Sequence, residues 1–227
     1  MSKKILNLYA GIGGNRKLWD DVLDIKVTAV EIDKKIAEIY KDYFPEDEVI
    51  VADAHEYLKD HYDEDWDFVW SSTPCPTHSR VRYAFGASNG SCDPVYPDMR
   101  LYQEIIFMEH YMDCKYSVEN VVPYYDPLIE PEFRSNKNYL WSNFKIDKIE
   151  VPTTGVIEVS DRSTEEKNVY ELEEHFGFDL SDYSRIDKEK VLKNCVHPEL
   201  GKHVLECAFD NKQMTLEKAN SEVSRDE

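Results

Sequence analysis

Leu8-Tyr9-Ala10-Gly11-Ile12-Gly13-Gly14 is the stretch that decides the fold of this chain. The apolar run Ile5–Tyr9 leads into it, which predicts a buried strand that ends in a glycine turn. Glycines at such a turn let the backbone approach a ligand, and the amides of a following helix favour an anionic group. The spacing is neither the G-x-G-x-x-G of dinucleotide enzymes nor a G-x-x-x-x-G-K-[ST] phosphate loop. Taken alone, the turn also fits an ordinary tight connection.

Strand and helix patterns alternate from this turn onward. Short apolar runs predict strands, and apolar residues at helical spacing predict helices between them. The predicted strands are Ile5–Tyr9, Val27–Val30, Val49–Val51, Asp67–Trp70 and Tyr116–Val118, and the predicted helices are Asn15–Leu23, Lys34–Tyr43, Ala54–Leu58 and Met99–Met112. This alternation indicates an α/β fold with a doubly wound, mostly parallel sheet. Further on we expect strands within Leu140–Ile149 and Val156–Val159, one or two helices within 160–190, and helices at Lys188–Cys195 and Glu199–Phe209.

Carboxylates follow the second and third predicted strands. Glu31 lies about twenty residues after the glycine turn, where a carboxylate can accept hydrogen bonds from both ribose hydroxyls of a nucleoside cofactor. Asp53 ends the third strand. Each could also be a solvated charge at a strand end. Because the carboxyl ends of parallel strands share one edge, the two residues and the turn together predict a nucleoside-binding crevice there.

A cysteine and a second carboxyl group end the fourth and fifth strands. Cys75 stands between Pro74 and Pro76, and Glu119 follows Tyr116–Val118. A cysteine alone is more often a buried, inert side chain. With Glu119 at the same edge, the pair suits nucleophilic addition to an electron-poor ring whose nitrogen the carboxyl group protonates.

Five stretches, taken in order, resemble the cytosine-5 DNA methyltransferase family. They are Leu8–Gly14, Glu31-Ile32-Asp33, Asp53-Ala54, Pro74-Cys75 and Glu119-Asn120-Val121. A sixth, Asn194-Cys195-Val196-His197-Pro198, resembles the family segment that returns to the cofactor site. Tyr124-Tyr125-x-Pro127-Leu128-Ile129 and Trp141-Ser142-Asn143-Phe144 look like the compact branch found in phages and mobile elements. The resemblance covers about residues 3–145 and 190–209.

The resemblance implies a Rossmann-like fold and a reaction that uses S-adenosylmethionine and releases S-adenosylhomocysteine. Cys75 attacks carbon 6 of a cytosine flipped out of duplex DNA, and Glu119 protonates N3, so that carbon 5 takes the methyl group. The implied cofactor-binding residues are Tyr9, Ala10, Gly11, Ile12, Gly13, Gly14, Glu31, Ile32, Asp53, Ala54, Pro74, Asn194 and Val196. The implied nucleic-acid-binding residues are Ser79, Arg80, Arg82 and Asn120. For Arg80 and Arg82, a solvated loop is an equally good interpretation.

The chain departs from the family pattern in two places. Pro76 stands where the family has Gln, and the Gln-x-Arg-x-Arg segment that clasps the cysteine loop is not evident after Val121. The nearest basic residues are Arg134 and Lys137. The recognition region is also short. We expect residues 1–145 to form the catalytic domain, 146–190 a reduced recognition region, 191–210 a return segment and 211–227 a flexible tail.

The charge balance argues against a nucleic-acid enzyme. Lys and Arg number 27 against 46 Asp and Glu, a net charge of −19, whereas phosphate binding favours a basic surface. Residues 75–145 carry only −2, against −8 each for 1–74 and 151–227. We therefore keep two alternatives: an RNA cytosine-5 methyltransferase, and a non-catalytic cofactor-binding protein that acts through a partner. A second subunit or a homodimer is a further possibility for DNA recognition.

Composition excludes other classes. The sequence has no apolar run long enough to span a membrane, and its five cysteines show no CxxC spacing. We expect no membrane partner, no metal, no disulfide framework, and a location in the cytoplasm of a bacterium or phage-infected cell. His78 is expected to be a hydrogen-bonded loop residue rather than a metal ligand.

Overall fold

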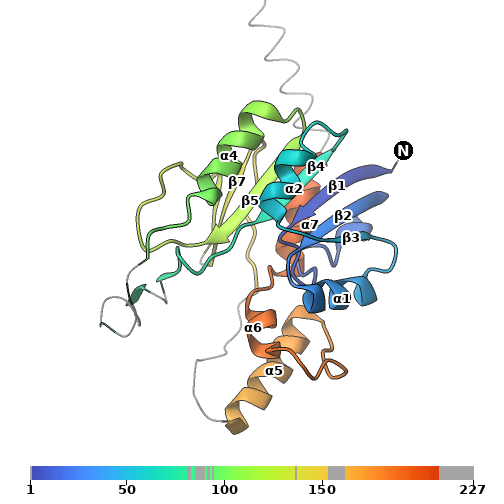
Figure 1. Ribbon diagram of the computed structural model, residues 1–227, viewed down its shortest axis with the longest axis vertical. Helices are drawn as coiled ribbons and strands as arrows, with labels where there is room; N and C mark the ends of the chain where they lie inside the picture. The colour runs from blue at the N-terminus through green and yellow to red at the C-terminus, as the bar shows by residue number, and fades with distance from the viewer. Residues whose placement is uncertain are drawn as a thin grey trace, which may run out of the picture.

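A seven-stranded sheet forms the centre of the molecule (Figure 1). The computed structural model describes residues 2–80, 83–84, 90, 93, 95–135, 137–152 and 162–209, with side chains of the last range from 168. The strand order is β3-β2-β1-β4-β5-β7-β6. The first five strands are parallel, and β7 and β6 are antiparallel additions at one edge. The strands are β1 (Lys3–Leu8), β2 (Ile25–Glu31), β3 (Glu48–Val51), β4 (Phe68–Ser72), β5 (Lys115–Val121), β6 (Phe133–Arg134) and β7 (Asn138–Ser142).

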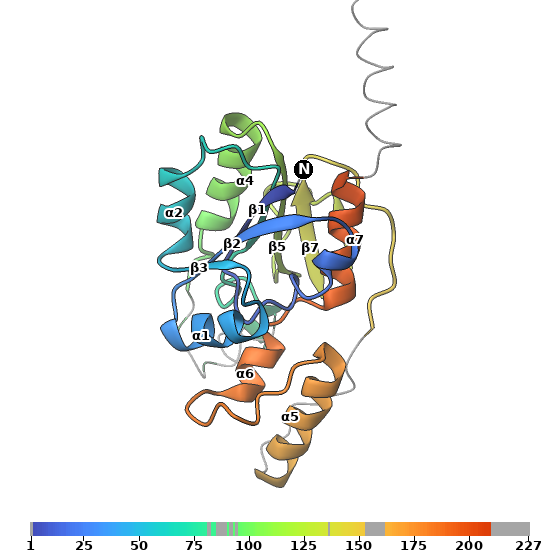
Figure 2. The ribbon, with the colours of Figure 1, turned by 90° about the vertical axis from the view of Figure 1, so that its right-hand side faces the viewer.

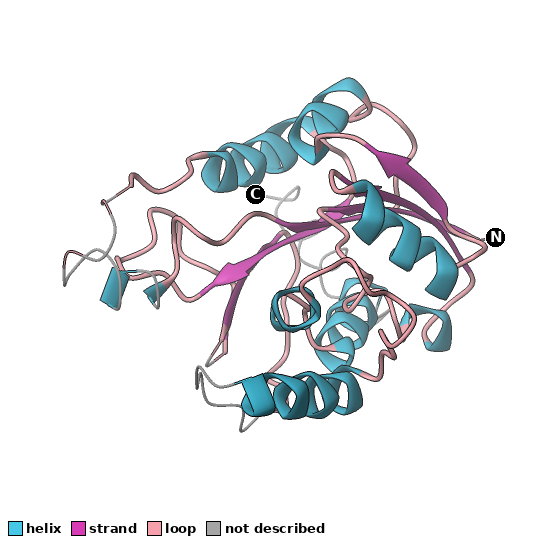
Figure 3. Cartoon of the chain, turned by 60° about the horizontal axis from the view of Figure 1, so that its bottom comes forward, coloured by secondary structure: helices cyan, strands magenta, loops and turns pink. Residues whose placement is uncertain are grey.

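Helices cover both faces of this sheet (Figures 2 and 3). One face packs against α2 (Ala54–Asp60) and α4 (Arg100–Tyr111), with Leu58 and Met108 in its core. The other packs against α7 (Pro198–Phe209) and the 3₁₀ helix η1 (Trp19–Asp21), and α1 (Lys34–Tyr43) lies beside β2 and β3. Because both faces are covered, the inner strands are apolar almost throughout. The prediction of a doubly wound, mostly parallel α/β sheet is confirmed.

The predicted recognition region packs directly against the catalytic domain. It contains α5 (Arg162–Phe176), and α6 (Lys188–Lys193) follows it. Leu172, Phe176 and Leu192 form one apolar cluster with Ile12 of the glycine turn and Ile39 of α1. Hydrophobic burial therefore holds these two helices at the carboxyl ends of the parallel strands. The predicted strand Val156–Val159 and the predicted tail 211–227 lie outside the described residues.

The prediction of a helix over Asn15–Leu23 is wrong, because only Trp19–Asp21 forms a single 3₁₀ turn. Helix α7 packs so closely here that a Cβ on Gly201 would lie 2.1 Å from the carbonyl oxygen of Asn15. The Trp19 indole Nε1 donates to the Gly201 carbonyl at 3.1 Å. These long-range contacts set the backbone path, so they override the local helical pattern.

The late part of the chain also differs from the pattern-based boundaries. The strand expected within Leu140–Ile149 is β7, which begins at Asn138 and ends at Ser142. It pairs with β5 on one side and with the two-residue strand β6 on the other, which we did not predict. A strand of two residues carries too little alternation to be recognised from sequence.

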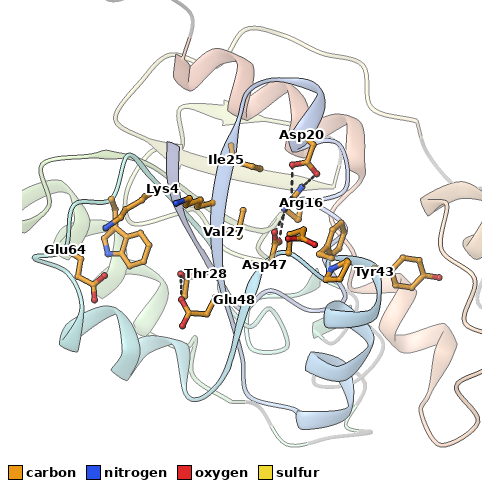
Figure 4. A pocket seen from close by; sticks show the side chains of 15 residues that line it. Lys4, Arg16, Asp20, Ile25, Val27, Thr28, Tyr43, Asp47, Glu48 and Glu64 are labelled. Carbon is orange, nitrogen blue, oxygen red and sulfur yellow. Dashed lines mark hydrogen bonds and ion pairs between the residues drawn. The ribbon is translucent and has the colours of Figure 1, made fainter. Parts of the chain in front are cut away.

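A buried ion pair connects the segment after the glycine turn to the start of β3 (Figure 4). Arg16 Nε and Nη2 donate to the Asp47 carboxylate at 2.9 and 3.0 Å, and the Tyr40 hydroxyl donates to it at 2.8 Å. Both charged side chains are only 4–5% exposed. Asp20 also binds Arg16, but its side chain is 67% exposed.

Arg16→Met is expected to lower the free energy of unfolding by about 3–5 kcal/mol, because it leaves the Asp47 carboxylate buried without its cationic partner. Asp20→Asn is the matched control, with an expected loss of about 1 kcal/mol or less, since water screens this exposed pair. Urea unfolding followed by circular dichroism measures both. Equal losses would show that burial of Asp47 does not determine the effect.

Candidate active site

The predicted site residues follow one edge of the sheet. Strand β1 lies between β2 and β4, and β4 pairs with β5 so that Ser72 stands opposite Glu119. The carboxyl ends of these four strands therefore present Glu31, the glycine turn, Cys75 and Glu119 in that spatial order. This arrangement agrees with the edge expected from the sequence.

The three glycines of the turn have different surroundings. A Cβ on Gly13 would lie 2.3 Å from the Phe44 ring, and one on Gly14 would lie 2.5 Å from the Val196 carbonyl oxygen. These two glycines are required for packing against α1 and the return segment. Gly11 has a φ of +56° and nothing within 4 Å of its Cβ direction, so its backbone faces open space.

The carboxylate of Glu31 holds the turn in place. Its Oε2 accepts from the Gly11 amide at 3.0 Å, and its Oε1 accepts from the Asp33 amide at 2.9 Å. Each oxygen keeps a second lone pair for a ligand hydroxyl. The neighbouring Ile32 side chain is 67% exposed, although it is a large apolar group. An apolar surface beside a carboxylate and an open backbone fits a nucleoside with free sugar hydroxyls.

Asp53 and Ala54 lie at the start of α2, beside this surface. Asp53 Oδ1 caps the helix by accepting from the amides of His55 and Glu56 at 2.9 and 3.2 Å. Its Oδ2 lies 3.8 Å from Nη1 of Arg100, and the side chain is 39% exposed. The sequence pattern placed Asp53 at the crevice but did not indicate its role as a helix cap.

A hydrogen-bond network around the buried carboxylate of Glu104 connects residues close to Gly11 and Asp53. Glu104 of α4 is fully buried and accepts hydrogen bonds from the hydroxyls of Tyr9 and Ser71, at 2.5 and 2.7 Å. His55 Nδ1 lies 3.0 Å from Glu104 Oε1, and this contact raises the pKa of the imidazole. Tyr9 has a φ of +54°, so Glu104 holds a residue whose backbone is in the left-handed region. Sequence reasoning missed Glu104, which reads as a charge in an amphipathic helix.

Cys75 is half-buried in the loop after β4. Burial and the negative charge of Glu119 raise the pKa of its thiol above the usual value. The amides of His78 and Ser79 donate to the Cys75 carbonyl at 2.9 and 3.1 Å, so the loop turns sharply after the cysteine. Pro74, a predicted cofactor residue, is exposed at the start of this loop.

Glu119 is buried at the end of β5, 6% exposed. Burial raises the pKa of its carboxyl group to about 7, although hydrogen bonds from Asn138 and Ser72 act in the opposite direction. Asn138 Nδ2 donates to Oε1 at 2.5 Å. At neutral pH the group is therefore divided between its acid and its base form, which suits proton donation to a ring nitrogen. Sequence reasoning missed Asn138, because the antiparallel pairing of β7 brings it to this place.

Residues at the end of β5 and directly after it bind the loop that carries Cys75. Asn120 is buried, and its amide donates to the carbonyl and hydroxyl oxygens of Thr73 at 2.9 and 2.8 Å. The Pro123 carbonyl accepts from Arg80 Nε at 3.0 Å, and the Tyr125 hydroxyl lies 2.5 Å from His78 Nδ1. Asn120 and Arg80, both expected to contact nucleic acid, thus bind this loop. The chain holds the cysteine loop here without an evident Gln-x-Arg-x-Arg segment.

The remaining predicted residues lie close to these features. Ser79 forms an isolated bridge with Pro123, and Arg82 lies outside the described residues. Val196 is buried with its carbonyl against Gly14, and Asn194 is exposed where α6 ends. The return segment therefore reaches the glycine turn. The described residues contain no group of three or more His, Cys, Asp or Glu that could hold a metal ion.

A cavity of about 730 Å³ lies elsewhere, at the amino-terminal part of β2 and around the Arg16–Asp47 pair (Figure 4). Its lining includes Lys4, Lys26, Glu48 and Trp66 and none of the predicted site residues. Parallel sheets of this kind bind ligands at the carboxyl ends of their strands, so this cavity is not a candidate for the cofactor.

Comparison with known proteins supports the family resemblance. Residues 3–104 match the C-5 cytosine-specific DNA methylase family, a range that includes the glycine turn, Glu31, Asp53 and Cys75 but not Glu119. The resemblance stated above is confirmed over this range, and S-adenosylmethionine is confirmed at family level as the expected cofactor. No curated protein matches the chain.

One solved structure supports the fold, and further methyltransferase structures match parts of the chain. A methyltransferase of Entamoeba histolytica, EhMeth, is 12% identical with a TM-score of 0.52, over 93% of this chain and 99% of that one. A proposed DNA modification methyltransferase encoded within an Escherichia coli prophage is 19% identical with a TM-score of 0.37, over 55% and 34%. A SAM-dependent methyltransferase from Archaeoglobus fulgidus is 18% identical with a TM-score of 0.35, over 53% and 45%. The fold is the Rossmann-like fold of methyltransferases. Within the described ranges, no helix is long and apolar enough to cross a membrane.

Proposed function

We propose, from the match of residues 3–104 to the C-5 cytosine-specific DNA methylase family, that this chain methylates carbon 5 of cytosine in DNA through a covalent adduct with Cys75. One observation carries the proposal. Cys75 follows β4 and Glu119 lies near the carboxyl end of the adjacent parallel strand β5, where burial raises its pKa to about 7. A nucleophile beside a carboxyl group that is protonated near neutral pH is the pair that addition to cytosine requires.

The proposed reaction begins with the Cys75 thiolate, which forms a bond to carbon 6 of the cytosine. Glu119 gives its proton to N3, so the electron pair of the former C5–C6 double bond is delocalised and carbon 5 becomes nucleophilic. When bound, S-adenosylmethionine supplies an electrophilic methyl group on a sulfonium centre. A water-mediated base then removes the carbon-5 proton, the C6–S bond breaks, and the N3 proton returns to Glu119.

Four residues of this chain bind the cofactor in the proposal. The Glu31 carboxylate accepts the ribose hydroxyls, and the open backbone at Gly11 lies beside the amino-acid end. Ile32, with its exposed side chain, contacts the adenine ring together with Asp53. Glu31 also bonds to the Gly11 amide, so one carboxylate both shapes the turn and binds the ligand.

Gly11→Ala tests this arrangement. The new methyl group enters the space left open for the ligand, so S-adenosylmethionine should bind more weakly by about tenfold or more. The cost in unfolding free energy should stay at about 1–2 kcal/mol, the penalty for a left-handed alanine. Calorimetry measures the first quantity and urea unfolding the second. Unchanged cofactor affinity in a folded Gly11→Ala protein would refute the proposed position.

Transfer of tritium-labelled methyl groups tests the function as a whole. We expect labelling of cytosine-containing duplex DNA, with 5-methylcytosine as the only labelled nucleoside after digestion. Labelling confined to structured RNA would show that the substrate is RNA rather than DNA, with the same methyl transfer to cytosine. Cofactor binding without labelling of either polymer would reject catalysis and favour a protein that acts through a partner.

A further inference from the structure

Two histidines and a lysine from distant parts of the chain lie near one another, on segments that adjoin the proposed site. His175 lies in the last turn of α5, His197 directly precedes α7, and Lys137 lies in the turn between β6 and β7. The two imidazole rings are 4.7 Å apart and meet edge to face, at 66°. The charge of Lys137 acts on both, since it lowers the pKa of each histidine in addition to the effect of burial.

Their neighbours locate this cluster between the two ends of the site. Lys137 adjoins Asn138, which donates to Glu119, and the Lys137 carbonyl accepts from the Val122 amide at 3.1 Å. His197 adjoins Val196, whose carbonyl lies against Gly14. Helices α5 and α6 share an apolar cluster with Ile12 of the same turn. The backbone segments that carry Lys137 and His197 therefore adjoin the two ends of the site, Glu119 and the glycine turn.

The hydrogen bonds of the cluster define its donors. His197 Nδ1 accepts from the Glu199 amide at 3.2 Å, so the proton of the neutral ring is on Nε2, which is left to donate. A proton on Nδ1 of His197 would break its hydrogen bond with the Glu199 amide. His175 is therefore the ring of the pair that can take up a proton without the loss of this hydrogen bond. The carboxylate of Glu199 lies near His197 and acts to raise the pKa of this ring, but burial, His175 and Lys137 together outweigh it.

The charge of the cluster calls for an anion. Lys137 brings a positive charge to two imidazoles that burial and this charge keep neutral, so a proton on either ring would be repelled unless an anion is present. A phosphate group relieves the repulsion and accepts all three donors, and the amino end of the twelve-residue helix α7 adds a favourable dipole. We propose that Lys137, His175 and His197 bind one backbone phosphate of the nucleic acid beside the flipped base, with uptake of a proton by His175. This inference rests on the proposed function.

The sign of the pH dependence follows from the chemistry. Phosphate binding favours the protonated form of His175, so nucleic-acid affinity should be highest at low pH and fall as the pH rises. The ammonium group of Lys137 adds an electrostatic contribution that does not depend on proton uptake by His175. The two residues are therefore separable: one determines the pH dependence and the other a constant electrostatic contribution.

Fluorescence anisotropy with a labelled cytosine-containing duplex tests the site in the full-length protein, at pH 6 and pH 8 over a range of salt. Lys137→Gln should lower the slope of log affinity against log salt by about 1 at both pH values. His175→Gln should do so at pH 6 only and remove the pH dependence. Lys193→Gln and His110→Gln, on α6 and α4, are the matched controls and should leave the slopes and the pH dependence unchanged.

Two further measurements separate the outcomes. If wild-type protein methylates the duplex while Lys137→Gln and His175→Gln keep its salt slope and pH dependence, the inference fails and the proposed function stands. If wild-type protein neither binds nor methylates the duplex, both fail. Calorimetry with S-adenosylmethionine should give wild-type affinity for both variants. A loss of cofactor affinity with unchanged duplex binding would assign the cluster to the cofactor carboxylate and overturn the inference.

Discussion

Cys75→Ala is expected to reduce methyl transfer by about 10⁴-fold or more, because it removes the nucleophile that forms the covalent adduct with carbon 6 of the base. Without the thioether, carbon 5 never becomes nucleophilic, and the bound cofactor has no acceptor. The loop should keep its shape, since its hydrogen bonds run through the Cys75 carbonyl and through Thr73, His78 and Arg80 rather than through the thiol.

The control for this variant is Cys114→Ala. Cys114 is also a half-buried free thiol, and burial raises its pKa to about 11, but it lies just before β5 at the opposite end from Glu119. Its replacement should leave the rate within about twofold of wild type, as for a site remote from the chemistry. Tritium transfer measures both rates. Comparable activity of Cys75→Ala and Cys114→Ala would refute the covalent mechanism.

A trapping experiment examines the adduct directly. A duplex with 5-fluorocytosine at the target position cannot lose its C5 substituent as a proton, so the C6–S bond should persist. Wild-type protein with S-adenosylmethionine should give a complex that survives denaturing electrophoresis, and Cys75→Ala should give none. The same complex from Cys75→Ala would assign the nucleophile to another residue.

Glu119→Gln is expected to lower the rate by about 10²–10⁴-fold, the usual contribution of a general acid. The amide keeps the size of the side chain but has no proton to give to N3. The Asn138 amide, which donates to Glu119 Oε1, can still bond to the new carbonyl oxygen. The loss should therefore appear in kcat more than in the affinity for DNA.

The pH profile of the wild-type protein follows from two raised pKa values. The productive form carries one proton, on Glu119, with Cys75 as the thiolate. Below the Glu119 pKa of about 7, Glu119 and Cys75 are both protonated and the thiolate is absent. The rate should therefore rise with pH up to about 7. It should then level off and fall above the raised pKa of Cys75, where the remaining proton is lost. We expect a bell-shaped profile with its acid limb near pH 7.

The same variant identifies the acid limb. In Glu119→Gln the only requirement left is the thiolate, so the limb near pH 7 should vanish and the residual rate should rise with the ionisation of Cys75. That ionisation should occur at lower pH than in wild type, because the negative charge of Glu119 no longer opposes it. An acid limb that persists near pH 7 would mean that another group limits the rate.

Much of the fold was predictable because it depends on local patterns. The helix predicted at Lys34–Tyr43 has those bounds in the structure, since Asp33 caps it and Ile39 and Tyr40 lie on its buried face. The strands that carry Glu31 and Glu119, and the strand that precedes Cys75, were recognisable from short apolar runs. The helix predicted at Asn15–Leu23 was wrong because contact with Gly201 of α7, far along the chain, sets the backbone there.

The sequence by itself determined that Glu31, Cys75 and Glu119 share one edge of the sheet, because the carboxyl ends of parallel strands must meet. Their spatial order along this edge follows from the strand order in the structure. Only the tertiary structure decided what surrounds these groups. The antiparallel return of β7 brings Asn138 to Glu119, and the return segment brings Val196 to Gly14. It also brings His197 to His175. Such contacts join residues far apart in the chain, and no local period records which of them will touch, because packing of the whole core selects the pairs.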